Sequence, residues 1–285
     1  MIRTKGETLK RWIPAWLKHW LRRPEAPILY RSQNQNIYHC TVQKCASQWV
    51  RAILSDPRIY RSCGLSPYRY QDHLPGQHDP RKLTERRFEQ ALPEATIVTT
   101  IYIDYEGFAS IPKPASYKAF FVMRDPRDVL ISWYYSSKIS HPLQGELGRI
   151  RQNLNRLSEQ DGILYCIDYL DEFGLFAAQR SWVGAASEDA NVLLVRYEDL
   201  IAEEAMATFE QLLRHCDIRV PGAGLAAILR AYRFEELSGR QRGEEDRSAH
   251  YRKGVAGDWR NHFTPAIAAR FEKVAGDLLS LWNYE

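Results

Sequence analysis

The 285-residue sequence has few of the features that indicate a metal centre or a disulfide framework. Its five cysteines are Cys40, Cys45, Cys63, Cys166 and Cys216, and no two of them form a Cys-x-x-Cys pair. Neither a zinc site nor a set of disulfides is indicated, and no metal ligand is assigned. Scattered cysteines in odd number are typical of a reducing compartment, so we expect a cytoplasmic protein.

The chain also has no long apolar run and no strong excess of one charge. The most apolar part of the N-terminus, residues 9–21, is too short and too charged to span a bilayer. The net charge of +4 is small for this length and is spread along the chain. A nucleic-acid tract needs a concentrated basic face, so we expect anionic small ligands and no nucleic acid as partner.

We divide the chain into a basic amphipathic extension at residues 1–30 and a domain at residues 31–285. The Leu9–Leu21 segment of the extension carries three tryptophans and is followed by two arginines. It either packs on the domain as an amphipathic helix or lies on an anionic membrane surface, with its tryptophans among the headgroups. Pro14 interrupts a continuous helix unless it falls in the first turn.

Short apolar runs alternate with helical patterns along the domain. The runs are residues 37–41, 95–101, 118–123 and 191–196. Helices are expected at residues 47–54, from about 126, at 144–182 with a break near Asp161–Gly162, at 198–215 and at 264–281. This alternation predicts a single α/β domain with a central, mainly parallel sheet flanked by helices. Residues 60–93 are expected to be a long loop that borders a site, and residues 237–257 a mobile loop.

Two of the strand–helix junctions carry a cation and hydroxyl groups. The first reads Gln43-Lys44-Cys45-Ala46-Ser47-Gln48-Trp49, with Ser47 expected to cap the helix. The second runs from Arg124 to Ser132 and has Pro126 near the start of its helix. The first N–H groups of a helix lack partners and carry a partial positive charge, so such junctions bind anions. Two of them in one domain predict a ligand with two separated phosphate-type groups.

The first junction differs from the Walker A loop of nucleotide triphosphatases. That motif reads G-x-x-x-x-G-K-[ST], whereas Lys44 stands three residues before Ser47 and follows no such glycine pair. A magnesium–triphosphate site is therefore unsupported, while a lysine that reaches one phosphate is supported. Cys45 is either a nucleophile activated by the helix start or a small loop residue, and we favour the second interpretation.

A third cluster reads Arg252-Lys253-Gly254-Val255-Ala256-Gly257-Asp258-Trp259 and places two cations on a flexible loop. Together the three segments resemble the sulfotransferases that use 3′-phosphoadenylyl sulfate (PAPS), over about residues 37–275. In that family a Pro-Lys-x-Gly-Thr-Thr-Trp loop binds the 5′-phosphosulfate, and here Gln43 and Ala46 replace its proline and glycine. The family's Arg-x-Pro-x-Asp-x-x-x-Ser segment binds the 3′-phosphate, and its Arg-Lys-Gly-x-x-Gly-Asp-Trp motif is matched at every specified position.

The resemblance implies a P-loop-like phosphosulfate-binding loop and the transfer of a sulfuryl group from PAPS to a hydroxyl, or an amine, of a small-molecule or glycan acceptor. No metal is implied, and the product is 3′,5′-adenosine bisphosphate (PAP). Lys44 would stabilise the departing phosphate. The cofactor-binding residues that the resemblance implies are Lys44, Cys45, Ala46, Ser47, Gln48, Trp49, Arg124, Ser132, Tyr197, Phe234, Arg252, Lys253 and Gly254. Of these, Tyr197 and Phe234 match residues that contact adenine.

The chain departs from the family at two places. Cytosolic members carry a catalytic histidine in a Lys-Thr-His segment, but residues 99–106 contain neither that lysine nor that histidine. Other branches use a carboxylate, so Asp104 and Glu106 are equal candidates for the general base, followed by His73. Tyr102 occupies the histidine position, but a phenol is mostly protonated at neutral pH. Of the family's dimer segment only Thr264 is unchanged, so the sequence does not support a homodimer formed in that way.

Two other classes of function are compatible with parts of the sequence. A nucleotide-dependent kinase of the P-loop type would share the phosphate-binding junction, but it needs the Walker glycines. A non-catalytic protein that binds adenosine bisphosphate, or a module that binds a membrane surface through its N-terminal helix, would need no general base. Binding of PAP and of ATP distinguishes these alternatives.

Overall fold

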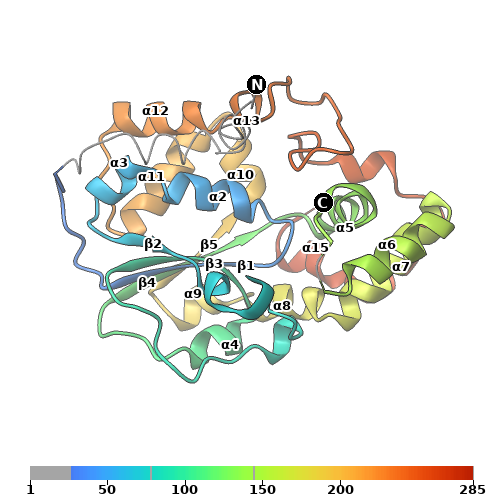
Figure 1. Cartoon of the computed structure of the whole chain (residues 1–285), viewed down its shortest axis with the longest axis horizontal. Helices are drawn as coiled ribbons and strands as arrows, with labels where there is room; N and C mark the ends of the chain where they lie inside the picture. The colour runs from blue at the N-terminus through green and yellow to red at the C-terminus, as the bar shows by residue number, and fades with distance from the viewer. Residues whose placement is uncertain (1–26, 78, 144, 285) are drawn as a thin grey trace, which may run out of the picture.

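A five-stranded parallel sheet forms the centre of the molecule (Figure 1). The computed structural model describes residues 27–77, 79–143 and 145–284, so the predicted helix at residues 9–21 lies outside the described residues. The strands are β1 (Asn36–Thr41), β2 (Ser66–Tyr68), β3 (Thr96–Tyr102), β4 (Tyr117–Met123) and β5 (Val192–Arg196). They are arranged in the order β2-β3-β1-β4-β5. The predicted α/β fold with a parallel sheet is confirmed.

The four predicted strands are all present, and β2 is the strand that the sequence did not predict. It lies within the expected loop at residues 60–93 and pairs with β3 at the edge of the sheet. It is three residues long and contains Pro67, which has no N–H to donate to a neighbour. A strand this short carries no alternating pattern, so only pairing with β3 defines it.

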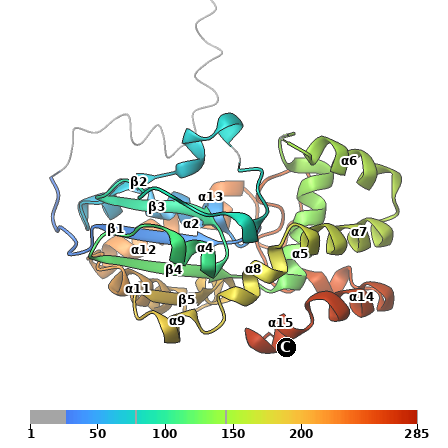
Figure 2. The ribbon, with the colours of Figure 1, turned by 90° about the horizontal axis from the view of Figure 1, so that it is seen from below.

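Helices cover both faces of the sheet. Their bounds are α2 (Ser47–Leu54), α3 (Pro57–Arg61), α4 (Tyr105–Ser110), α5 (Pro126–Tyr135), α6 (Leu147–Arg156), α7 (Glu159–Glu172), α8 (Leu175–Ser181), α9 (Ala185–Glu188), α10 (Tyr197–Ile201), α11 (Ala205–His215), α12 (Gly222–Ala231), α13 (Phe234–Ser238), α14 (Pro265–Ala275) and α15 (Asp277–Leu281). In Figure 1, α2, α3, α11 and α12 lie above the sheet and α4, α8 and α9 below it. Figure 2 shows α5, α6, α7 and α14 grouped beside the sheet, and α7 contacts both α5 and α14.

Alternation along the buried strands divides the core into two parts. Phe120 packs in the part that includes α2, α11 and α12, whereas its neighbour Phe121 packs in the other part. Phe121 stacks on Trp182, with ring centroids 4.6 Å apart, and Trp182 is fully buried. The three central strands β3, β1 and β4 are buried along most of their length on both faces, which explains why their sequences show little alternation of apolar and polar residues.

The helical segment predicted at residues 144–182 consists of three helices, and the predicted break near Asp161–Gly162 is wrong. The break between α6 and α7 lies at Leu157–Ser158, where the Ser158 hydroxyl accepts a hydrogen bond from the backbone N–H of Asp161. Gly162 lies inside α7, and a Cβ there would approach the ring of Tyr134 to 2.8 Å. The glycine allows α7 to pack closely against α5. The expected helices at 198–215 and 264–281 are likewise divided, into α10 and α11 and into α14 and α15.

The first described residues are attached to the domain. The backbone N–H groups of Leu29 and Tyr30 donate to the carbonyl oxygen of Arg61, and the Tyr30 hydroxyl bonds to the carboxylate of Asp217. Over residues 27–284, apart from the two single-residue gaps, no helix has the length and apolar character that a membrane crossing needs.

Candidate functional site

The loops that follow β1 and β4 border a cavity of about 1030 Å³. The loop before α14 contributes another part of its wall, and α5, α6 and α7 line the part away from the sheet. All of the predicted cofactor-binding residues except Cys45 line this cavity. The tertiary structure therefore brings three segments that are far apart in the sequence to one place.

The loop between β1 and α2 makes two left-handed turns before the helix begins. Lys44 has φ 70° and Ala46 has φ 57°, a region that residues other than glycine enter at a cost of about 1–2 kcal/mol. Ala46 is the N-cap of α2, so the prediction that Ser47 caps this helix is wrong. The Ser47 hydroxyl instead shares a hydrogen bond of 2.8 Å with the hydroxyl of Tyr102 at the end of β3. The turns leave the first N–H groups of α2 directed away from the helix, as an anion site requires.

Lys44 is the cation closest in sequence to this helix start. Burial lowers its pKa to about 8, with further contributions from the nearby positive charges of Arg124 and Arg252. Three cations that repel one another in one cavity are stabilised when an anion binds among them. The electrostatic arrangement therefore favours a ligand with several negative charges.

Arg124, which follows the end of β4, is largely buried, with 12% of its side chain exposed. Burial opposes its charge, but nearby acidic groups, the carboxylate of Asp128 foremost, hold its pKa above the ordinary value. Its guanidinium donates to the backbone oxygen of Lys44 at 3.3 Å and packs over the ring of Tyr197 at 4.8 Å. Its Nε is buried and has no hydrogen-bond partner among the described residues. A ligand oxygen would satisfy this donor.

Asp128 connects the second segment to the third. Its carboxylate accepts hydrogen bonds from the backbone N–H groups of Gly257, at 2.6 Å, and Trp259, at 3.0 Å. The side chain is 1% exposed, so these bonds form in a largely dehydrated environment where an unpaired carboxylate would be costly. Asp128 thus fixes the loop at 239–257 against the start of α5. That stretch is a loop as predicted, although α13 extends to Ser238; its mobility stays a prediction.

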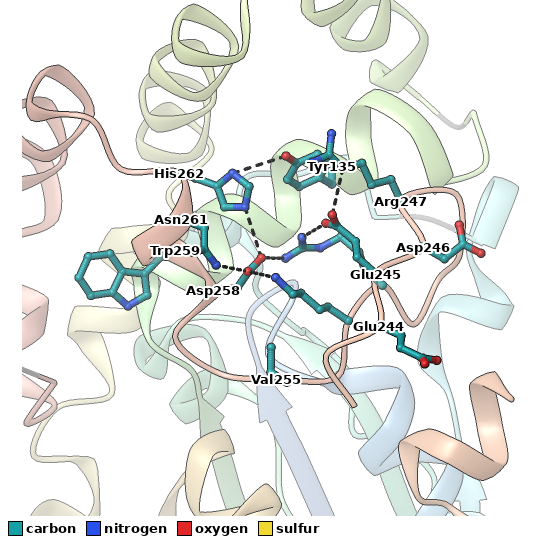
Figure 3. A network of polar contacts seen from close by, with 12 residues as sticks. Tyr135, Glu244, Glu245, Asp246, Arg247, Val255, Asp258, Trp259, Asn261 and His262 are labelled. Atoms are coloured by element: carbon teal, nitrogen blue, oxygen red, sulfur yellow. Dashed lines mark hydrogen bonds and ion pairs between the residues drawn. The ribbon is translucent and has the colours of Figure 1, made fainter. Parts of the chain in front are cut away.

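Asp258 holds the two cations of the third segment (Figure 3). Its two carboxylate oxygens accept hydrogen bonds of 2.5 Å from Arg252 and from Lys253. Arg252 also pairs with Glu245, and His262 lies 3.4 Å from Asp258 on the other side. Burial opposes the charge of Asp258, but these hydrogen bonds hold its pKa far below the ordinary range. The carboxylate remains ionised and fixes both cations at the cavity wall.

Aromatic side chains form a separate part of the wall. The indole of Trp49 donates to the backbone oxygen of Tyr232 at 2.7 Å and meets the ring of Tyr197 edge to face, with centroids 6.4 Å apart. Phe234 lies against Gly254, which has φ +71°, and a Cβ at that glycine would come within 2.4 Å of the Phe234 ring. Only glycine allows this approach. The three rings suit a flat heterocycle.

The structure does not bring the remaining predicted site residues into this cavity. Cys45 is fully buried and does not line it, and burial raises the pKa of its thiol to about 12, so a thiolate nucleophile is disfavoured. Asp104 caps α4 by accepting a hydrogen bond from Gly107, and burial raises its pKa. Glu106 is exposed and pairs with Arg87, and His73 is exposed and stacks on a tyrosine. Their role as bases stays a prediction without support from the wall of this cavity.

The sequence analysis missed a row of aromatic rings on the far wall. Trp133 of α5 stacks near Tyr169 of α7, and Tyr169 in turn stacks near Tyr165 and Phe173, with centroids 5.9–6.5 Å apart. All four line the cavity. Residues 165, 169 and 173 are four apart, which places them on one face of a helix, so their spacing was a signal available in the sequence. His250 also lines the cavity and lies two residues before the third segment begins at Arg252.

Comparison with known proteins agrees with this geometry. A family model described as "Sulfotransferase domain" matches residues 35–283. A 3-beta-hydroxysteroid sulfotransferase of Cavia porcellus is 28% identical over 263 residues, and a 3-alpha-hydroxysteroid sulfotransferase of the same species is 25% identical over 256; each alignment covers 82% of this chain and 80% of the relative. The structure of mouse sulfotransferase SULT7A1 complexed with PAP has a similar fold, with a TM-score of 0.59 at 18% identity, over 90% of this chain and 91% of that one. Because the family model matches most of its length, the chain belongs to the sulfotransferase family.

Proposed function

We propose that this protein transfers a sulfuryl group from PAPS to a hydroxyl of a ring-bearing acceptor. The observation that carries the proposal is the convergence of three cation-bearing segments, centred on Lys44, Arg124 and Arg252, on one cavity that also presents a separate set of aromatic rings. PAPS has the complementary features, which are an adenine, a 3′-phosphate and a 5′-phosphosulfate. The relatives named above are sulfotransferases, which supports the same reaction.

Each part of PAPS is assigned to a group of residues that line the cavity. The helix start of α2 and Lys44 hold the 5′-phosphosulfate, because unpaired N–H groups and an ammonium converge there. Arg124 and Arg252, with the hydroxyl of Ser132, hold the 3′-phosphate, which a guanidinium binds through paired charge-assisted hydrogen bonds. Trp49, Tyr197 and Phe234 contact the adenine. When bound, PAPS supplies the activated sulfuryl group, and these residues orient it.

The contribution of the protein to the reaction is electrostatic. Sulfuryl transfer resembles phosphoryl transfer in that negative charge grows on the leaving oxygen during in-line displacement. Lys44 and the helix start lie where that charge would develop, so they stabilise the transition state more than the ground state. Lys44→Ala is therefore expected to lower turnover more than it lowers affinity for PAPS.

The row of aromatic rings supports the choice of acceptor. Trp133, Tyr165, Tyr169 and Phe173 provide an apolar wall on the part of the cavity away from the sheet. The buried polar atoms Trp133 Nε1, Tyr70 OH and Gln71 Oε1 belong to residues that line the cavity and have no hydrogen-bond partner among the described residues. Pockets of this kind bind molecules with a flat apolar body and a few polar groups. A sterol, a phenol or a sugar ring meets this description.

Calorimetric titration with PAP, 5′-AMP and ATP tests the proposed cofactor. The expected order is PAP well above 5′-AMP, because only PAP carries the 3′-phosphate that Arg124 and Arg252 would bind. Arg180→Ala is a matched control, since Arg180 pairs with Asp277 and neither residue lines the cavity. Tight ATP binding that needs magnesium, with weak PAP binding, would support a nucleotide-dependent kinase and overturn the proposal. PAP binding without transfer to any acceptor would indicate a non-catalytic binding protein.

A further inference from the structure

The position that carries a histidine in the family's cytosolic members carries a tyrosine in this chain. Tyr102 stands there, at the end of β3, and its hydroxyl is engaged with the hydroxyl of Ser47 at 2.8 Å. The reaction nevertheless releases a proton from the acceptor, since a hydroxyl becomes a sulfate ester. A group with an available lone pair must therefore reach the acceptor from another part of the cavity wall.

Among the histidines that the structure describes, only His141 and His250 line the cavity. His39 is buried in the sheet and bonds to Thr99, while His215 contacts backbone oxygens. His141 has its Nδ1 2.9 Å from the backbone oxygen of Pro142. His250 differs because no hydrogen bond to either of its ring nitrogens is found among residues 27–284 as described. A lone pair on His250 is therefore available to a ligand.

His250 shares its cavity with the residues assigned to the reacting end of the proposed cofactor. Its ring meets the ring of Tyr251 edge to face, with centroids 5.1 Å apart, and Tyr251 also lines the cavity. His250 keeps exposed surface, but partial loss of water around its ring and, after it, the positive charges of Lys44, His141 and Arg51 lower its pKa. His250 lines the same cavity as Lys44, the residue assigned to the 5′-phosphosulfate, and precedes Arg252 by two residues. His250 is thus a neutral imidazole on the same wall as that lysine.

We propose that His250 is the general base that removes the proton from the acceptor hydroxyl. The acceptor oxygen forms a bond to sulfur while the bond from sulfur to the 5′-phosphate oxygen breaks, and the electron pair of that bond leaves with PAP. The acceptor proton moves to the unprotonated ring nitrogen of His250, which becomes an imidazolium, and later passes to solvent. The proposal depends on the proposed function, since it concerns the same cavity and the same donor.

Binding of PAPS would also raise the basicity of His250. In the free protein the cations Lys44 and Arg51 and the ring of His141 disfavour its protonated form. PAPS would bring phosphate and phosphosulfate charges into the cavity and offset those cations. The imidazole then becomes a stronger base only when the donor is present. The loop also carries Arg252, so contact of that arginine with the cofactor would hold His250 in position.

A comparison of two acceptors tests the proposal in the full-length protein. A 3-hydroxysteroid has an un-ionised hydroxyl and needs a base, whereas 4-nitrophenol is already largely ionised in mildly alkaline buffer and needs none. With saturating PAPS, His250→Gln is expected to lose about 10²–10⁴-fold in rate with the hydroxysteroid. Its rate with 4-nitrophenol and its affinity for PAP are expected to stay near the wild-type values. A merely structural role would reduce both rates together.

His141→Gln is the competing variant, because His141 is the other histidine on this wall. The proposal is overturned if His250→Gln retains the hydroxysteroid rate, if it loses both rates equally, or if His141→Gln shows the acceptor-dependent loss instead. If the wild type uses neither acceptor, the assay is the hydrolysis of PAPS by water, measured as release of PAP. His250→Gln is then expected to lose about 10²–10⁴-fold in the rate of this hydrolysis. Failure of the wild type to bind PAP would overturn the proposed function itself, which separates the two results.

Discussion

Binding of PAP is expected to weaken as the pH rises through about 8, because Lys44 loses its proton in that range. Burial and two neighbouring arginines lower the pKa of Lys44 to about 8 in the free protein. A bound phosphate would favour the ammonium and raise that pKa again. The affinity for PAP is therefore constant at pH values below the pKa of Lys44 in the free protein. It falls above that pH until the pKa of Lys44 in the complex is reached.

The size of the effect follows from the protonated fraction of Lys44. Between pH 7 and pH 9, with the pKa at about 8, that fraction falls from about nine-tenths to about one-tenth, so the dissociation constant rises roughly tenfold, or about 1.4 kcal/mol. The phosphates of PAP are ionised throughout this range, since their second pKa is near 6. Isothermal titration calorimetry at constant ionic strength measures the change, because salt also screens these charges.

Lys44→Arg separates this contribution from those of other groups. A guanidinium keeps its charge to beyond pH 12, so the variant has no titration at this position. Hydrogen bonding to Asp258 raises the pKa of His262. Titration of His262 can therefore add to the pH dependence of the dissociation constant, and this addition remains in Lys44→Arg. The dissociation constant of Lys44→Arg is expected to change much less between pH 7 and pH 9. Equal pH dependence in both proteins would show that Lys44 does not contact the ligand.

Three further substitutions test individual contacts. Arg124→Ala is expected to weaken PAP binding by about 1.5–3 kcal/mol and to leave 5′-AMP binding nearly unchanged; equal weakening of both would place Arg124 away from the 3′-phosphate. Gly254→Ala would force a Cβ within 2.4 Å of the Phe234 ring at a positive φ, so calorimetry should show weaker PAP binding, and unchanged affinity would contradict the packing. Ala46→Gly relieves a left-handed alanine and should raise the denaturation midpoint, by about 1 kcal/mol of stability; a lower midpoint would argue against strain there.

Much of the fold could be predicted because the signals are local. Each long strand is a continuous apolar run, and a run of this kind is recognisable wherever it pairs. The strand β2 and the division of the helices between 144 and 182 could not be predicted in the same way. Strand β2 exists only through its pairing with β3. The break between α6 and α7 depends on Ser158, which caps α7, and capping is one of several kinds of hydrogen bond that a serine side chain can make.

The candidate site shows the same distinction between sequence and tertiary structure. Strand–helix junctions and the resemblance of three segments were sufficient to nominate Lys44, Arg124 and Arg252, since those signals lie within a few residues of each cation. No local pattern linked Asp128 to the backbone of Gly257, or placed His250 and Lys44 in one cavity, because the residues of each pair are separated by more than a hundred positions. Their proximity arises from the parallel sheet, which gathers its loops at one cavity. The sequence alone therefore nominated the groups for an anionic cofactor, whereas only the tertiary structure placed His250 on the wall of the cavity that those groups also line.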